Sequence, residues 1–298
     1  RRSPRLTFPK LGYTRRMSNI LQSDIWARFQ ESNGHTVIRK SGNGWSYLAT
    51  VEGGATGRYL YSPYGPVASS AVAFDEALAS LKEEAAKLRC LFVRIEPTES
   101  AIWGDQDAAA FLARRGAVLA PRQVQPSHTQ IIDLSGTEDE ILKGMSSSYR
   151  NRHRNLHKKG VTVEVSTNPS DMTILFGFLE ETADRNGFNR QQDEYLMQVA
   201  RVLMPAGAAS LYIAKLTDEN GESTPIAAAF VYDSDDTRTY AHAAASFEHR
   251  NLSAGVVVVT NFILDAKRKG LKYVDLFGIA PEDQPDHEWA GFTKFKKS

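Results

Sequence analysis

The feature that most constrains the fold is an order of elements that occurs twice along the chain. The doubling is loose: each half mixes helices and strands, and hairpins join antiparallel strands. The second occurrence is clearer, with three strands over 209–246, a helix over 254–270 and a strand over 271–278. The turn at Asn220-Gly221 is typical of an antiparallel hairpin. Hairpins mixed with helices predict an α+β fold in each half rather than a doubly wound parallel sheet.

The first half and the segment that joins the halves contain the remaining elements. Strands are expected over 44–53, 58–67, 91–97, 129–135 and 161–166, and helices over 70–90, 105–116, 136–160, 169–187 and 194–204. Ser170 is the expected cap of the helix over 169–187. The acidic sequence GTEDE near 135 opens the long helix, and we place a domain boundary there. The chain then divides into a basic flexible arm (1–16), a first domain (17–135) and a second domain (136–298).

Composition and charge exclude several classes of protein. The 298 residues predict two domains or one large one. A net charge of +1 gives no overall attraction to nucleic acid or membrane, so an anion site has to be a local patch. The single Cys90 allows neither an internal disulfide nor a cysteine metal site, and it favours a reducing, cytoplasmic location. No run of 18 apolar residues predicts a membrane span. We expect no cofactor and no metal.

A basic segment, SSYRNRHRNLHKKG over 147–160, is the first candidate for chemistry. Five cations fall within ten residues, namely Arg150, Arg152, Arg154, Lys158 and Lys159. On a continuous helix, positions 150, 154, 157 and 158 would share one side. The segment is then either a solvated face or a phosphate site, because guanidinium groups match phosphate oxygens bidentately.

Two further stretches allow alternative interpretations. In RNLSAG, Arg250, Ser253 and Gly255 imitate the turn with which GNAT acyltransferases hold the pyrophosphate of coenzyme A at a helix N-terminus. A plain helix start is an equal alternative, because Ser253 replaces a glycine of that turn. In YVDLFGIAPEDQPDHEWAGFTKFKKS, Asp275 lies on a strand and either caps or forms a salt bridge, and the final lysines are either solvated or face a ligand.

Seven motifs in order resemble the Fem family of peptidyltransferases (FemA, FemB and FemX), from about residue 19 to 298. They are LQSDIW (21–26), SPYGPV (62–67), FVRIEP (92–97), VQPSHTQIIDLS (124–135), YRNRHRNLHKKGV (149–161), FLEETADRNGF (178–188) and DLFGIAP with HEWAGFTKFK (275–296). The resemblance implies two tandem GNAT-like domains facing a cleft. It also implies that a stem-peptide amine attacks the ester of an aminoacyl-tRNA to form the interpeptide bridge of peptidoglycan. The acceptor would be UDP-MurNAc-pentapeptide or lipid II.

The same resemblance assigns roles to residues. Phe295 and Lys296 would lie at the reaction centre, where the lysine stabilises the oxyanion and the departing ribose 3′-oxygen. Glu96 would orient the acceptor amine or accept its proton. Substrate contacts are expected at the residues Arg28, Tyr64, Arg150, Arg154, Tyr240 and Trp289, with Arg150 and Arg154 holding the diphosphate. Contacts with tRNA are expected at Arg152, Lys158 and Lys159.

Departures from the family pattern keep other functions open. Gln30 stands where the family can carry a phosphate-binding lysine, and Arg28 is the expected substitute. No heptad-rich arm interrupts 160–298, so the chain looks more like FemX than FemA or FemB. Family relatives continue beyond the position of Ser298, so a C-terminal tail is expected to be missing. The basic arm would contact tRNA or the inner membrane leaflet. The alternatives are a GNAT acyltransferase that uses acyl-coenzyme A and a non-catalytic protein that binds tRNA or precursor.

Overall fold

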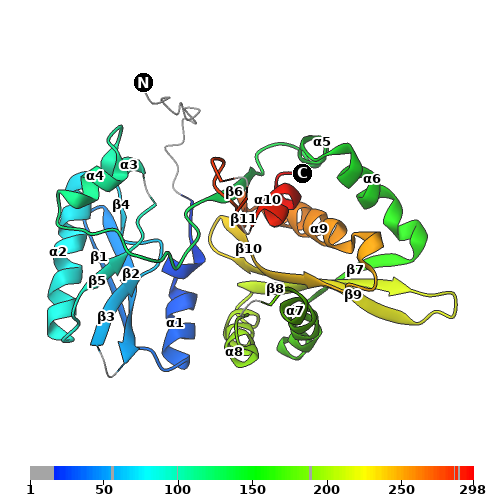
Figure 1. The fold of residues 1–298 in the computed structure, drawn as a ribbon, viewed down its shortest axis with the longest axis horizontal. Coiled ribbons are helices and arrows are strands. Elements are labelled where there is room, and N and C mark those ends of the chain that lie inside the picture. The colour runs from blue at the N-terminus through cyan, green and yellow to red at the C-terminus, as the bar shows by residue number, and fades with distance from the viewer. Residues whose placement is uncertain (1–16, 55–56, 99, 188–189, 285, 288) are drawn as a thin grey trace.

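The first of two sheets is formed by the N-terminal part of the chain (Figure 1). The computed structural model describes residues 17–298 apart from 55–56, 99, 188–189, 285 and 288, so the basic arm over 1–16 lies outside the described residues. The sheet contains β1 (Val37–Gly42), β2 (Trp45–Gly54), β3 (Gly57–Ser62), β4 (Val67–Ala68) and β5 (Val93–Ile95). Its order is β1-β2-β3-β5, with β4 beside β2. Helix α2 (Ala71–Lys87) leads into β5, which runs parallel to β3.

The second sheet repeats this plan with more strands. Its order is β6-β11-β10-β9-β8-β7. The strands are β6 (Thr129–Asp133), β7 (Val161–Ser166), β8 (Ala209–Thr217), β9 (Ser223–Asp233), β10 (Thr237–Ala245) and β11 (Tyr273–Gly278). Helix α9 (Ala254–Arg268) leads into β11, which runs parallel to β10 as β5 does to β3. The expected doubled α+β architecture is confirmed.

Helix α9 forms although it contains four consecutive valines. Val256 to Val259 are all buried, because the sheet covers one side of α9 and α6 (Ser147–Asn155) packs against it from another. β-branched residues lower helix propensity by a few tenths of a kcal/mol each, whereas burying a valine side chain contributes roughly 1.5–3 kcal/mol. Burial therefore outweighs the low helix propensity, and the helix expected over 254–270 is found at Ala254–Arg268.

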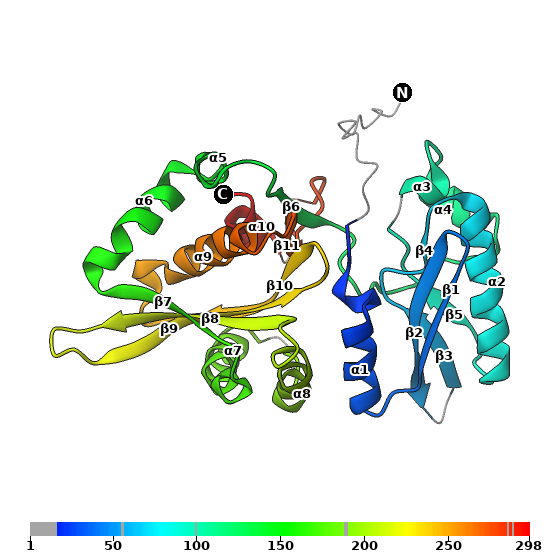
Figure 2. The same ribbon diagram turned by 180° about the vertical axis from the view of Figure 1, so that it is seen from behind.

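Each sheet with its helices forms one lobe of the molecule. Helix α1 (Asp24–Ser32), which was not predicted from the sequence, joins the first lobe to the second. Figures 1 and 2 show it between the first sheet and α8 (Asp193–Leu203). The Ser23 side chain caps α1 by accepting a hydrogen bond from the Trp26 N–H at 3.2 Å. Trp26 and Phe29 are buried in one apolar cluster with α7 (Met172–Asn186), α8, β8 and β9. This shared core holds the lobes together.

Four sequence predictions need correction. The strand at 129–133, assigned to the first domain, pairs with β11 in the second sheet and covers the edge of β11 that would otherwise be open. The domain boundary expected at 135 therefore lies after this strand instead of before it. The helix expected over 136–160 is α5 (Glu138–Gly144), α6 and a 3-10 turn (Leu156–Lys159). Extended Met145 ends α5, and Ser146 caps α6.

The other two corrections concern a helix cap and the end of a strand. Asn168, not Ser170, accepts the capping hydrogen bond, and it caps a 3-10 turn before α7. The strand expected over 58–67 ends at Ser62, where a Pro-Tyr-Gly-Pro turn begins.

The remaining α-helices are α3 (Ser100–Trp103), α4 (Ala108–Ala113) and α10 (Ala290–Lys296). Within the described part of the chain, no helix has both the length and the apolarity needed to cross a bilayer.

Candidate active site

The candidate site lies where β10 and β11 stop pairing. Their parallel pairing covers only three residue pairs, from Thr237–Tyr273 to Thr239–Asp275. Beyond them β10 shifts register between Tyr240 and His242, and β11 shifts between Asp275 and Gly278. Bulges of this kind re-aim side chains next to functional sites. Helix α10, which carries Phe295 and Lys296, packs at this point.

Asp275 shapes the bulge in β11. Its Oδ1 accepts a hydrogen bond from the Phe277 N–H at 2.7 Å, and Phe277 has a φ of +63°. A left-handed conformation is uncommon for an aromatic residue and costs roughly 1–3 kcal/mol. Gly278 follows, and a Cβ there would lie 2.8 Å from Trp289 Cζ3 and 3.0 Å from Pro126 Cγ. Only glycine fits between these rings.

Lys296 is held by this bulge. Its Nζ donates to the Gly278 carbonyl at 2.7 Å and lies 5.8 Å from the centre of the Tyr240 ring. Burial lowers the pKa of Lys296 to about 8, although the nearby Asp275 charge opposes this. Burial also raises the pKa of Asp275 to about 6, against the Phe277 N–H, the Thr129 hydroxyl and Lys296. Asp275 is 8% exposed and forms no ion pair within 4.0 Å of a described cation. Of its two expected roles, a cap or a salt bridge, it therefore acts as a cap, because it accepts the Phe277 N–H.

Phe295 covers the first turn of α9. Its ring lies 5.8 Å from that of Tyr149, whose hydroxyl donates to the Phe295 carbonyl at 3.2 Å. A Cβ on Gly255 would be 3.8 Å from Phe295 Cζ. Arg250 donates to the Phe247 carbonyl at 2.8 Å and stacks on the Phe247 ring. The turn that imitates a coenzyme A site is thus partly covered, and its arginine is engaged elsewhere.

Tyr64 and Glu96 form the opposite wall. Tyr64 has a φ of +50°, and its hydroxyl donates to the Pro126 carbonyl at 3.3 Å. Burial raises the pKa of Tyr64, and the Asp275 and Glu96 charges raise it further. Glu96 accepts hydrogen bonds from the Tyr61 hydroxyl at 2.6 Å and from the backbone N–H groups of residues 124 and 125 at 3.2 and 3.3 Å. It therefore ties the end of β5 to the segment that crosses between the lobes.

The expected basic residues lie elsewhere. Arg150 donates to the carbonyls of Lys143 and Met145, so it closes the end of α5. Arg152 donates to the Ser148 hydroxyl at 2.9 Å. The side chains of Arg154, Lys158, Lys159 and Arg28 are exposed. In Figure 1, α6, which carries Arg150, Arg152 and Arg154, lies on the side of α9 away from the first lobe, whereas Arg28 lies on α1. The switch to a 3-10 turn after Asn155 also breaks their expected alignment.

A cavity of roughly 450 Å³ lies between the lobes, where the family resemblance implied a cleft, but most of its lining residues were not predicted. Tyr64 and Phe277 are among its lining residues, so it borders the bulge that holds Lys296. The other lining residues come from α1, β2, β3, α8, β9 and β10 and from the segments beside them. No local pattern marks them, because each contributing element supplies only one to three residues. The one sequence signal was the pair of motifs around Trp26 and Tyr64.

The match to known structures covers most of the chain. A crystal structure of FemX superposes with a TM-score of 0.81 at 19% identity, over 94% of this chain and 88% of FemX. The chain shares its fold with FemX. A tandem GNAT protein from the clavulanic acid biosynthesis pathway matches with a TM-score of 0.51 at 16% identity, over 88% of this chain and 79% of that one. L-PGS from Bacillus licheniformis matches with a TM-score of 0.53 at 13% identity, over 92% and 81%.

Sequence comparisons agree with the FemX-like fold. The acetyltransferase (GNAT) domain model matches residues 143–289. The lipid II:glycine glycyltransferase of Staphylococcus epidermidis is 29% identical over 98 residues, which is 33% of this chain. That match spans 23% of the staphylococcal protein. The resemblance to the Fem family and the expectation of two GNAT-like domains are confirmed.

Proposed function

We propose that this chain is a cytoplasmic transferase of the Fem type, which moves an amino acid from aminoacyl-tRNA to a peptidoglycan precursor. The acceptor is the stem-peptide amine of lipid II or UDP-MurNAc-pentapeptide, and the product is an interpeptide bridge. The observation that carries the proposal is Lys296, a half-buried ammonium held by one carbonyl where β10 and β11 part. The FemX fold and the glycyltransferase match support it.

The chemistry needs a fixed cation more than a protein nucleophile. The acceptor nitrogen attacks the ester carbonyl, a C–N bond forms, and the carbonyl oxygen becomes an oxyanion. When the tetrahedral intermediate collapses, the C–O bond to the ribose breaks, and the 3′-oxygen leaves as a hydroxyl with a proton from the attacking amine. Lys296 stabilises the oxyanion and the departing oxygen, and its desolvated position strengthens that interaction.

The surrounding residues position the reactants. Phe295 lies on the α9 side of the Lys296 ammonium, while Tyr240 and Trp289 line the proposed reaction centre around it. Tyr64 closes the side of the first lobe. Of the two roles expected for Glu96, we assign it orientation of the acceptor, because its oxygens already accept three hydrogen bonds.

The basic side chains on the outer surface suit polyanions. We assign Arg152, Lys158 and Lys159 to the tRNA backbone, because phosphate contacts rely on solvent-accessible lysine and arginine. Arg150 and Arg154 remain the candidates for the diphosphate of the acceptor, with Arg28 as a further one; Arg150 uses only Nη1 in its hydrogen bonds to the carbonyls of Lys143 and Met145. Contact of this surface or the basic arm with the inner membrane leaflet belongs to the same proposal.

A transfer assay tests the function. Purified protein is mixed with a tRNA pool charged with labelled amino acids and with either acceptor, and products are read by mass spectrometry. A gain of one aminoacyl unit that disappears in Lys296→Met and persists in Lys294→Met is expected, because Lys294 is an exposed lysine on the same helix. No gain with either acceptor would reject the proposal.

Calorimetric titration with coenzyme A tests the alternative enzyme. Coenzyme A binding without aminoacyl transfer would favour an acyl-coenzyme A reaction, whereas tRNA or precursor binding without either reaction would favour the non-catalytic protein.

A further inference from the structure

The cavity between the lobes has one wall made by strands of the first sheet. Leu48, Thr50 and Glu52 alternate along β2, so their side chains share the face that lines the cavity. Tyr59 and Tyr61 do the same on β3 and lie directly across from Glu52 and Thr50. This wall therefore presents a carboxylate and a hydroxyl framed by two aromatic rings.

Helices and the second sheet make the facing wall. Trp26 and Gln30 lie one turn apart on α1, and Gln191 and Tyr195 lie four residues apart at the start of α8. Further lining residues are Tyr232 on β9 and Thr239 and His242 on β10. Burial lowers the pKa of His242 to about 4, so this imidazole is neutral. The facing wall thus consists of neutral amides, hydroxyls and aromatic rings.

The charge of the lining is unusual for a nucleotide or phosphate site. Among the lining residues that the structure describes, none is lysine or arginine, and Glu52 is the sole carboxylate. Glu52 Oε1 accepts a hydrogen bond from Thr50 Oγ1 at 2.7 Å and lies 3.6 Å from His35 Nδ1. Phosphate recognition uses arginine or lysine, and a diphosphate beside Glu52 would be repelled. Amide and amine groups, in contrast, find acceptors, donors and ring faces here.

We propose that this cavity binds a phosphate-free peptide portion of the acceptor, with an amine or amide hydrogen donated to Glu52, and leaves any diphosphate outside. This inference rests on the proposed function and names the part of the substrate that the chain selects. Tyr64 and Phe277 line the cavity next to the bulge that holds Lys296, so a peptide in the cavity borders the reaction centre.

Calorimetry on the intact chain tests the proposal without depending on transfer. The probes are a synthetic stem pentapeptide with a free side-chain amine and UDP. The pentapeptide is expected to bind, Glu52→Gln to weaken it about tenfold through loss of a charge-assisted hydrogen bond, and UDP not to displace it. Gln30→Lys, which places a cation in the cavity, is expected to raise UDP affinity. The matched control, Ser32→Lys, adds the same charge on the exposed side of α1 and is expected to leave UDP affinity unchanged.

Each other result overturns the proposal. These results are displacement of the pentapeptide by UDP, no pentapeptide binding, unchanged pentapeptide affinity in a folded Glu52→Gln protein, or equal effects of Gln30→Lys and Ser32→Lys on UDP. If the proposed function fails but this inference holds, the peptide binds without transfer. If the function holds and this inference fails, transfer proceeds and UDP competes for the cavity.

Discussion

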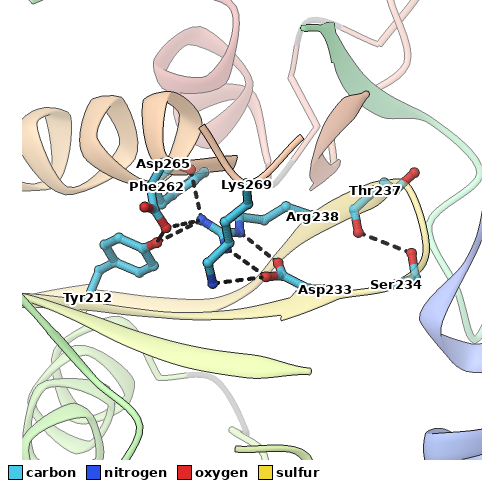
Figure 3. A network of polar contacts seen from close by, with 8 residues as sticks. All are labelled: Tyr212, Asp233, Ser234, Thr237, Arg238, Phe262, Asp265 and Lys269. Atoms are coloured by element: carbon cyan, nitrogen blue, oxygen red, sulfur yellow. Dashed lines mark hydrogen bonds and ion pairs between the residues drawn. The ribbon is translucent and has the colours of Figure 1, made fainter. Parts of the chain in front are cut away.

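Two cations of the second lobe that are withdrawn from solvent, Arg238 and Lys296, are satisfied to very different degrees. Arg238 is 0% exposed and donates through Nε and Nη2 to both oxygens of Asp233, each at 2.6 Å (Figure 3). Its Nη1 donates to the Tyr212 hydroxyl at 2.7 Å, the Phe262 carbonyl at 3.0 Å and Asp265 at 3.1 Å. Among the residues that the structure describes, the ammonium of Lys296 contacts one carbonyl and one ring face.

The pKa values move in opposite directions for this reason. Burial alone would lower the pKa of Arg238, but Asp233 and Asp265 hold it above its usual range. Burial does lower the pKa of Lys296, because Asp275 is too far to pair with it. A buried cation whose hydrogen bonds are all made links the strands and helices that supply its partners. A buried cation with few partners can still stabilise a negative charge that develops during a reaction. Under the proposed function, Arg238 is then a structural cation and Lys296 the one that takes part in chemistry.

The largest expected effect is on catalysis, from Lys296→Met. Removing the cation should lower the transfer rate by about 10²–10³-fold, the loss measured when one oxyanion donor is deleted. The free energy of unfolding should not fall, because the ammonium has few partners to lose. Initial rates and urea unfolding of the same preparation measure both quantities. A loss of stability comparable to that of an Arg238 variant would erase the distinction between the two cations.

Arg238→Met should have the opposite signature. It leaves Asp233 and Asp265 without their main partner, at a cost of about 3–5 kcal/mol of unfolding free energy. Arg268→Met is the matched control, because Arg268 pairs with Glu138 on the exposed side of α9, and such pairs contribute about 0–1 kcal/mol. Equal unfolding midpoints in the two variants would contradict the structural role of Arg238.

The sequence predicts the two cations unequally. The strands and helix that carry Arg238 and its partners follow from periodicity and turns, yet nothing local shows that Asp233 and Asp265 converge on one guanidinium. Lys296 is identified by family resemblance, and its carbonyl partner is invisible because Gly278 lies 18 residues earlier. Helix α1 was missed because its apolar face, Trp26 and Phe29, is buried in a core that residues from both lobes build together. Contacts between distant segments, rather than element types, are what the sequence leaves out.

Asp275 variants should show whether the bulge positions Lys296. Asp275→Ala removes the acceptor of the Phe277 N–H, so the Gly278 carbonyl shifts and the rate falls by about tenfold to hundredfold, the scale of a small misplacement. Asp275→Asn keeps an acceptor oxygen and should retain most of the rate at neutral pH. Because it removes the charge that supports protonated Lys296, its alkaline decline in rate should begin at lower pH than in the wild type. Identical pH–rate profiles for the Asp275→Asn variant and the wild-type protein would argue against this coupling.

Glu96 provides a test on the opposite wall, with a smaller expected effect. In Glu96→Gln the amide oxygen still accepts from the backbone N–H groups of residues 124 and 125, and the amide nitrogen can donate to the Tyr61 hydroxyl. We therefore expect only a several-fold fall in kcat/KM. A general base would lose about 10²–10⁴-fold instead. Steady-state kinetics of Glu96→Gln beside Glu96→Ala, which loses all three hydrogen bonds, distinguish orientation from proton transfer.

The smallest expected effect is the pH dependence of Lys296 itself. Its pKa of about 8 lies below the usual lysine value, so the cation is fully present at low pH and is lost as the pH rises through about 8. The acceptor amine loses its proton over a higher range and pushes the rate in the opposite direction, which hides the effect in a single profile. Lys296→Arg keeps its charge throughout, because arginine stays protonated. The ratio of wild-type to Lys296→Arg rates cancels the amine, and it should fall as the pH rises through about 8. A ratio that stays constant from about pH 6.5 to 9.5 would mean that the charge of Lys296 does not titrate in this range, and that the contrast with Arg238 lies in geometry alone.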